Sequence, residues 1–256
     1  MHLRKLLEIK SHMKKIFVFI NFLFLVSCSF AQKAPSHQQW DKLLKKHVNA
    51  AGMVHYKGFQ KDKTELNAYL KTLSDNAPQS SWSENDQKAF WINAYNAYTV
   101  ALILKNYPVK SIKDIAGNIY KVNTPWDIKF INIGGKKYDL NNIEHGILRK
   151  KFDDPRIHFA LVCASISCPK LLRDAYTGAL LNAQLDDAGK DFLNDRTKNR
   201  VSANKAELSK YFSWYKGDFT KNGSLADFIN KYSKTKMNGN TKVSSIDYNW
   251  SLNEQK

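Results

Sequence analysis

The segment from His158 to Pro169 holds the residues whose types and spacing best suit covalent chemistry. Proline is favoured in the first turn of a helix, so the sequence predicts a helix that opens at Pro169 with Cys168 as its N-cap. Unpaired backbone N–H groups and the helix dipole favour a thiolate at that position. Cys168 would then be the nucleophile of a thiol-dependent acyl transfer, with His158 on a preceding strand as general base. Glu144 would orient the imidazole.

The same residues allow other interpretations, which the sequence leaves open. Cys163 and Cys168 lie five positions apart and could form a disulfide in an oxidising compartment. A zinc site made of His145, His158 and the two cysteines matches no standard ligand spacing, so we predict no metal site. His158 could also be a buried histidine with a structural role. Glu144 and His145 are adjacent, and on a helix they would point about 100° apart and would not share one site.

Three more polar residues are candidates for substrate binding. Asn93 and Asn96 lie one helical turn apart in an apolar segment, and buried amides must find hydrogen-bond partners. Arg156 follows an Asp-Asp-Pro turn, where pairing with a carboxylate is the alternative role. The chain contains no phosphate-binding glycine loop, HExxH or GxSxG motif. We therefore predict no cofactor, and no nucleotide enzyme, zincin or common serine esterase.

Residues 14–31 have the pattern of a secretory leader: two lysines, about eleven mostly apolar residues, and then small residues. The apolar stretch is shorter than the roughly twenty residues of a transmembrane helix. The Leu-Val-Ser-Cys sequence that ends at Cys28 resembles a lipobox with a lipidated cysteine, while Ala31 could end an ordinary signal-peptidase site. We favour the lipoprotein. Residues 1–12 lack the leader pattern, so Met13 is the expected start of translation.

The formal net charge of +17 would suit a nucleic-acid-binding protein. However, the lysines are scattered instead of clustered between aromatic residues, and an exported protein meets little nucleic acid, so we predict no nucleic-acid partner. The expected location is the periplasm, or the outer membrane as a lipoprotein if Cys28 is modified. The predicted partners are an envelope peptide or protein as substrate, and the membrane that holds the lipid.

The elements that must position these residues follow from hydrophobic periodicity and turn signals. The 3.6-residue period predicts helices near 37–50, 62–75, 83–105, 141–149, 169–176, 178–194 and 224–234. Alternation around Gly134-Gly135 predicts a hairpin, and further strands are predicted near 156–164, 199–209 and 242–248. The fold class is therefore α+β. After a leader region over residues 1–31, we expect one compact domain over 32–256, with a helix-rich N-terminal half around a small, mostly antiparallel sheet.

Three motifs resemble, in the same order, those of the family known as domain of unknown function 547. They are FWINAYNA at 90–97, IEHGILR at 143–149 and DPRIHFALVCASISCP at 154–169. The resemblance covers about 38–235 and implies a shared domain, but no settled activity goes with the family. Bacterial members resemble this chain in carrying an export leader. Plant members join the domain to a coiled-coil region and are described as interaction proteins.

The fold is, by analogy, similar to papain-like and transglutaminase-like cysteine enzymes. Their nucleophile stands at a helix N-terminus, as predicted for Cys168, but papain-like enzymes place the cysteine before the histidine, whereas His158 comes first here. Two hypotheses follow. The preferred one is a thiol-dependent hydrolase or acyltransferase that acts on peptide, amide or thioester bonds. The alternative is a non-catalytic protein- or ligand-binding module of the cell envelope.

Overall fold

The computed structural model describes residues 33–115 and 124–256 of the chain. The predicted leader, with Met13 and Cys28, lies outside the described residues. None of the described helices is long and apolar enough to span a membrane.

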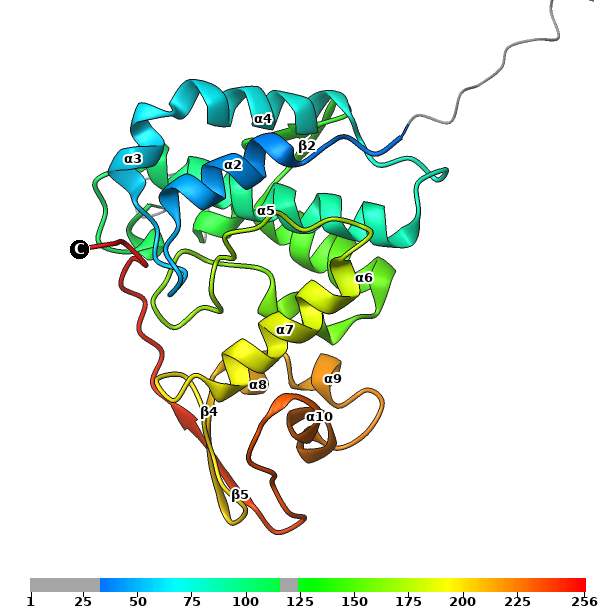
Figure 1. Ribbon diagram of the computed structural model, residues 1–256, viewed down its shortest axis with the longest axis vertical. Coiled ribbons are helices and arrows are strands. Elements are labelled where there is room, and N and C mark those ends of the chain that lie inside the picture. The colour runs from blue at the N-terminus through cyan, green and yellow to red at the C-terminus, as the bar shows by residue number, and fades with distance from the viewer. Residues whose placement is uncertain (1–32, 116–123) are drawn as a thin grey trace, which may run out of the picture. The chain divides into compact units, whose positions relative to one another are not determined.

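Helices of the N-terminal half pack around one long buried helix, α5 (Glu84–Asn106). Two helices, α3 (Tyr56–Lys61) and α4 (Lys63–Asp75), pack on α5, and α2 (Gln38–His47) packs on α3 and α4 (Figure 1). Apolar residues cover every face of α5, which explains why it is buried on nearly all sides. The sequence predicted all of these helices except the short α3: α2 and α4 from the hydrophobic period, and α5 from its cap and its long apolar run.

Two buried asparagines of α5 act as substitutes for backbone peptide groups. Asn96 donates to the carbonyl oxygen of Ala160 and accepts the N–H of Val162, both at 2.9 Å. Asn93 does the same with one residue, Tyr176, donating to its carbonyl at 2.7 Å and accepting its N–H at 3.0 Å. The expectation that these amides must find partners is confirmed. As a result, α5 holds the chain on both sides of the two cysteines.

A hairpin and two single turns of 3-10 helix follow α5. The turns are η1 (Ile112–Asp114) and η2 (Pro125–Asp127). In the hairpin, β1 (Ile131–Ile133) pairs antiparallel with β2 (Lys136–Tyr138). The two glycines between these strands have φ angles of 59° and 74°, which a tight turn requires and glycine adopts without steric cost. The predicted hairpin is confirmed.

The C-terminal half combines short helices with a three-stranded sheet. Its central strand, β4 (Lys205–Ser209), is antiparallel to β3 (Arg200–Val201) and parallel to β5 (Lys242–Ile246). The helices of this half are α7 (Leu181–Asn194), α8 (Tyr211–Trp214), α9 (Lys216–Phe219) and α10 (Leu225–Tyr232) (Figure 1). Residues 33–256 form one compact unit, and the α+β class is confirmed. The described strands form two small sheets, one of them mixed, instead of the single mostly antiparallel sheet that was predicted.

Two predicted elements around the cysteines are wrong. The segment predicted as a strand near 156–164 is a 3-10 helix, η4 (Pro155–Phe159), followed by irregular chain, so His158 stands on a helical turn. No helix opens at Pro169. Instead, the N–H of Cys168 bonds to the carbonyl of Ser165 at 3.1 Å in a tight turn.

Side chains from distant helices explain why the segment after Pro169 stays irregular. The carboxylate of Asp41 accepts the N–H of Ala175 at 3.0 Å. The amide of Gln184 accepts the N–H of Thr177 at 3.1 Å and donates to the carbonyl of Ala175 at 2.9 Å. Together with the hydrogen bonds from Asn93 of α5 to the backbone of Tyr176, these contacts satisfy backbone groups that a helix would otherwise pair.

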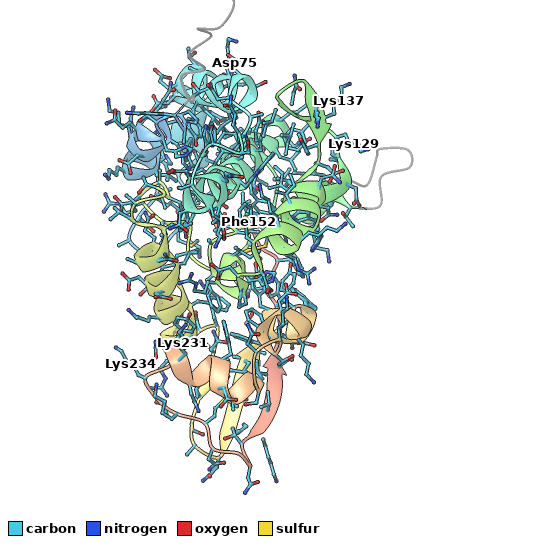
Figure 2. All side chains as sticks on the ribbon, turned by 90° about the vertical axis from the view of Figure 1, so that its right-hand side faces the viewer. Asp75, Lys129, Lys137, Phe152, Lys231 and Lys234 are labelled. Carbon is cyan, nitrogen blue, oxygen red and sulfur yellow. A yellow bond between two sulfur atoms is a disulfide. The ribbon has the colours of Figure 1, made fainter. Side chains whose placement is uncertain are left out.

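Exposed lysines lie on several elements of this framework. Lys129, Lys137, Lys231 and Lys234 are exposed and project from the surface (Figure 2). They belong to the segment before β1, to β2, to α10 and to the chain just after α10. This spread over separate elements agrees with the scattered lysines of the sequence.

Replacing Asn96 by alanine should lower the free energy of unfolding by about 2–4 kcal/mol. Two hydrogen bonds are lost, and the two backbone groups that they satisfied stay buried. Urea unfolding followed by circular dichroism measures the difference. The matched control is Asn222→Ala at an exposed asparagine, which should change stability by less than about 0.5 kcal/mol. Small and equal effects at both positions would contradict the role assigned to Asn96.

Candidate functional site

A cavity of about 220 Å³ lies beside the cysteine segment and is the candidate functional site. Half of the residues in its wall are tyrosines and tryptophans: Tyr95, Trp126, Tyr211, Trp214, Tyr215 and Trp250. The rest of the wall consists of Asn141, Glu144, His145, His158, Leu161 and Cys163. An apolar wall with a few convergent polar groups is the usual composition of a small-molecule site.

A π-helix, η3 (Asn142–Leu148), brings two adjacent polar residues to the cavity, and α6 (Arg149–Phe152) continues it. The N–H of Arg149 bonds to the carbonyl of Glu144, five residues back, which is the wide turn of a π-helix. In this geometry Glu144 and His145 both line the cavity. The expectation that they would not share one site assumed an α-helix and is wrong. Such π-turns are rare and are frequent at functional sites.

His158 lies between two carboxylates. Its Nε2 is 2.7 Å from Oδ2 of Asp218, and its Nδ1 is 4.0 Å from Oε1 of Glu144. The imidazole stacks on Tyr215, with 3.8 Å between the ring centroids. Arg149 donates to the same Asp218 through two nitrogens, at 2.6 and 2.8 Å. Asp218 therefore joins His158 to Arg149, whereas Glu144 lies beyond hydrogen-bond distance from the imidazole.

These contacts determine the protonation of the site. Hydrogen bonds with its two partners, His158 first, hold the pKa of the Asp218 carboxyl well below its usual range. Burial raises the pKa of Tyr215 and of Tyr95, and the negative charge of Glu144 raises both further. Asp218 is therefore a carboxylate over the whole neutral range. Both phenols remain protonated and can act as hydrogen-bond donors.

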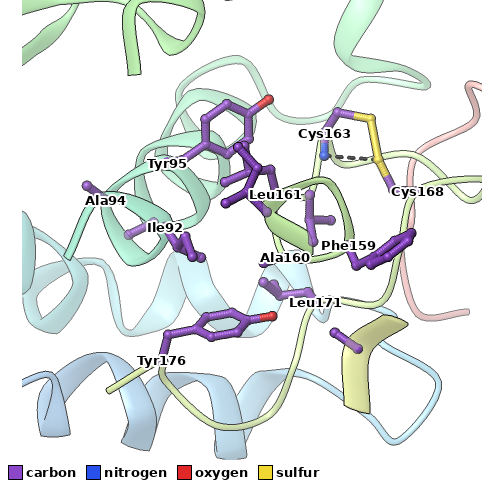
Figure 3. Close-up of a cluster of buried hydrophobic side chains, with 14 of the residues drawn as sticks. Ile92, Ala94, Tyr95, Phe159, Ala160, Leu161, Cys163, Cys168, Leu171 and Tyr176 are labelled. Atoms are coloured by element: carbon purple, nitrogen blue, oxygen red, sulfur yellow. Dashed lines mark hydrogen bonds between the residues drawn. A yellow bond between two sulfur atoms is a disulfide. The ribbon is translucent and has the colours of Figure 1, made fainter. Parts of the chain in front are cut away.

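Cys163 and Cys168 form a disulfide, one of the alternatives that the sequence left open. Their Cα atoms are 6.3 Å apart, within the usual range for a disulfide. The N–H of Cys163 also lies 3.0 Å from the sulfur of Cys168 (Figure 3). Ala164, which follows the first cysteine, has a φ angle of 59° in the left-handed region. That conformation costs a residue other than glycine about 1–3 kcal/mol and is common near functional sites.

The two sulfurs have different surroundings. The Cys168 sulfur is 3.3 Å from the hydroxyls of Tyr211 and Tyr248, and the residue is 1% exposed. Cys163 is also 3.3 Å from the Tyr248 hydroxyl, but it lines the cavity, which Cys168 does not. Of the contacts that the structure describes, none joins His158 to Cys168. The predicted nucleophile and base are therefore near in sequence without being in contact.

The three residues predicted for substrate binding lie outside the cavity wall. Asn93 and Asn96 use their amides to hold backbone groups of the core. Arg156 forms ion pairs with Asp154 at 2.9 Å and with Asp186 at 3.0 Å. This is the alternative role that the sequence allowed for Arg156.

Several wall residues were not predicted from the sequence. Trp214 is 46% exposed on the cavity wall, and Trp250 reaches the cavity from the C-terminal segment. Asp218, the nearest carboxylate to His158, has no motif around it. The one available signal is the aromatic density of residues 211–215, but the sequence does not show which segment those rings meet.

The zinc interpretation finds no support among the described residues. Within residues 33–115 and 124–256, no three His, Cys, Asp or Glu side chains are placed to hold a metal ion. The two cysteines proposed as ligands are bonded to each other instead.

Comparison with known families supports the resemblance drawn from the three motifs. Residues 79–193 match the family described as "Protein of unknown function, DUF547", which is the family that the three motifs resemble. The matched part includes α5, the π-helix, His158 and both cysteines. Comparisons with curated proteins and with solved structures found no match. The analogy with papain-like and transglutaminase-like enzymes stays a prediction.

In Asp218→Asn, the free energy of unfolding should decrease less as the pH is lowered than it does in the natural chain. Because the folded protein depresses the pKa of Asp218, its contribution to the free energy of unfolding is present above the ordinary carboxyl value of about 4. The contribution falls away as the pH drops further toward the folded value. The variant should therefore be less stable than the natural chain at pH 6, with the difference shrinking below about pH 4.

Urea unfolding at pH 6, 4 and 3 measures this difference. Asp247→Asn is the matched control, because that carboxylate is fully exposed and pairs only loosely with Lys210, at 3.5 Å. The control should differ little from the natural chain at any pH. A deficit of Asp218→Asn that stays constant across the series would show that Asp218 contributes by packing and not by its charge.

Proposed function

We propose that this domain is a ligand-binding module of an exported protein and that the aromatic cavity is its binding site. The observation that carries the proposal is the cavity itself, about 220 Å³ enclosed by six aromatic side chains and one buried carboxylate, Glu144. Sites for drug-sized ligands measure roughly 300–1,000 Å³. The proposed ligand is therefore a small molecule, or one small group of a larger molecule.

Ring contacts join the aromatic wall into a continuous surface. Trp126 meets Trp250 edge to face, and Trp250 stacks on Trp214, each pair with centroids 5.8 Å apart. Trp214 contacts Tyr211 at 5.9 Å, and Tyr211 meets Tyr215 edge to face at 5.6 Å. Rings that are already held by their neighbours lose little freedom when a ligand binds. This pre-organisation favours binding.

The disulfide supports a binding role over a catalytic one. While the two sulfurs are bonded to each other, neither cysteine offers the thiolate that a nucleophile requires. The bond instead restrains the segment that presents Leu161 and Cys163 to the cavity. Disulfides persist in oxidising compartments, which supports the proposed export to the periplasm or the outer membrane. A lipid on Cys28 would hold the module at a membrane face.

A thiol-dependent hydrolase or acyltransferase is the second candidate function. One observation favours it: Cys163, His158 and Glu144 line the same cavity. This function requires an external dithiol, which would reduce the disulfide to two thiols and become oxidised itself. A thiol could then pass its proton to His158 and attack the carbonyl carbon of a peptide, amide or thioester. The C–N or C–S bond would break, the leaving group would take the proton from His158, and water or another acceptor would release the acyl group from the sulfur. Cys168 is the nucleophile predicted from the sequence, and Cys163 is the cysteine that faces the cavity.

The redox state of the cysteine pair discriminates between the two functions. In protein purified without reductant, peptide mapping should find Cys163 linked to Cys168, with neither alkylated by iodoacetamide. Reduction should expose both thiols and lower the free energy of unfolding by about 2 kcal/mol, as expected for so short a loop. The double variant C163S/C168S should show a similar loss and no further change on reduction. Free cysteines in the isolated protein, one alkylating rapidly below pH 7, would favour the enzyme instead.

A bulky residue at the mouth of the cavity should block binding. His145 is exposed and lines the cavity, so His145→Trp should narrow the entrance without disturbing the core. A library of small fragments, screened by ligand-observed NMR, should yield binders of the natural chain that this variant no longer binds. His55→Trp, at an exposed histidine outside the cavity wall, is the matched control and should keep them. Finding no binders, or binders that ignore both substitutions, would reject the proposed site.

A further inference from the structure

We infer that the ligand of this cavity carries an alkylated ammonium group, such as a trimethylammonium. The inference rests on the proposed binding function and adds the chemical class of the ligand. It follows from the charge of Glu144, from the aromatic side chains around it, and from the apolar surface that these rings and Leu161 offer to alkyl groups.

Glu144 is a buried carboxylate that hydrogen-bonds to the phenols of Tyr95 and Tyr215 but forms no ion pair with a lysine or arginine of the described residues. It is 5% exposed and lies on the cavity wall. Among the described residues, the one basic group within 4.0 Å is His158, and the other nitrogen of that imidazole is committed to Asp218 at 2.7 Å. Arg149 is likewise paired with Asp218. Since burying a carboxylate without a cation is costly, the geometry favours a ligand that brings one.

The aromatic rings of the wall attract cations through their faces. Two of these rings already hold cations of the protein: the Lys113 ammonium lies 5.1 Å from the centroid of Trp250, and the Arg149 guanidinium lies 5.4 Å from that of Tyr215. Neither basic residue belongs to the cavity wall as described. A cation inside the cavity would lie among six aromatic side chains and the Glu144 carboxylate. That combination recognises quaternary ammonium groups.

The wall suits an alkylated ammonium better than a bare one. A bare ammonium has three N–H donors, and each needs an acceptor when it leaves water. Besides the carboxylate, the polar side chains of the wall are two histidines, three tyrosines and Asn141, whose amide donates to Asp127 at 2.7 Å. Two of the tyrosine hydroxyls, those of Tyr95 and Tyr215, are already hydrogen-bonded to Glu144. An alkylated ammonium has no such donors to satisfy. Its methyl groups gain instead by burial against the rings and Leu161.

Three probes of nearly equal shape and different charge test this inference. Choline carries a trimethylammonium group, 3,3-dimethylbutan-1-ol is its neutral counterpart, and 3,3-dimethylbutanoate is an anion of similar size. Each is titrated into the full chain, with the disulfide intact, at constant ionic strength. Isothermal titration calorimetry measures affinity, and tryptophan fluorescence reports on the wall, since Trp126, Trp214 and Trp250 line it. We expect choline to bind about tenfold or more tightly than the alcohol, and the anion to bind most weakly.

Two variants test whether the preference for choline over the alcohol comes from Glu144 and from the aromatic wall. Glu144→Gln should remove most of the preference for choline over the alcohol, whereas Glu65→Gln, at an exposed glutamate, should leave it unchanged. If Glu144→Gln does not fold, Trp214→Leu serves in its place, because this residue is 46% exposed and its replacement keeps the wall apolar. Trp214→Leu should weaken choline binding more than alcohol binding.

The outcomes separate the inference from the function on which it rests. Selective choline binding that depends on Glu144 supports both. If the alcohol or the anion binds as well as choline, the cavity is a ligand site of another class, and the inference is overturned while the proposed function stands. If no probe binds and the fragment screen also finds no occupant that His145→Trp displaces, both are overturned.

Discussion

Asn96, buried in the core, donates to the carbonyl of Ala160 and accepts the N–H of Val162. Because buried peptide groups must be paired where water is excluded, this double contact fixes the path of the chain just before the first cysteine. Asn93 makes the same pair of hydrogen bonds with the backbone of Tyr176, beyond the second cysteine. The cysteine segment can therefore stay irregular, with a disulfide and a left-handed Ala164, because α5 satisfies backbone groups that no local helix or strand pairs. The cavity wall depends on this restraint.

Two carboxylates beside the cavity, Asp218 and Glu144, differ in how closely basic groups approach them. Asp218 takes two hydrogen bonds from Arg149 and one contact from His158, which explains why its pKa lies well below the usual range. One carboxylate therefore serves two basic groups, and Glu144 is left 4.0 Å from the imidazole. The same arrangement stabilises the protein and leaves a negative charge facing the cavity. The same few residues thus serve the structure and the proposed recognition of a ligand.

The C-terminal segment completes the wall by bridging two parts of the fold. Its Ser251 carbonyl accepts the N–H of Ile166 at 2.9 Å, and the N–H of Asn253 donates to Ala164 at 3.1 Å. Asn253 in turn accepts the N–H of Val54 at 2.8 Å, which ties the same segment to the N-terminal half. These bonds hold the nearby Trp250 at the cavity. Together with the disulfide, they make the wall stiff on the side that faces the cysteines.

The sequence by itself determined the elements that depend on neighbours along the chain. The hydrophobic period and the Ser83 cap predicted α5, and the paired glycines predicted the hairpin, because helices and tight turns are specified by local contacts. The family motifs also marked His158, Glu144 and both cysteines. Only the tertiary structure decided that no helix follows Pro169, that the cysteines are bonded to each other, and that aromatic residues from position 95 to position 250 share one cavity. The reason is physical: the hydrogen bonds and ring contacts that decide these features come from residues far away in sequence, which local periodicity does not detect.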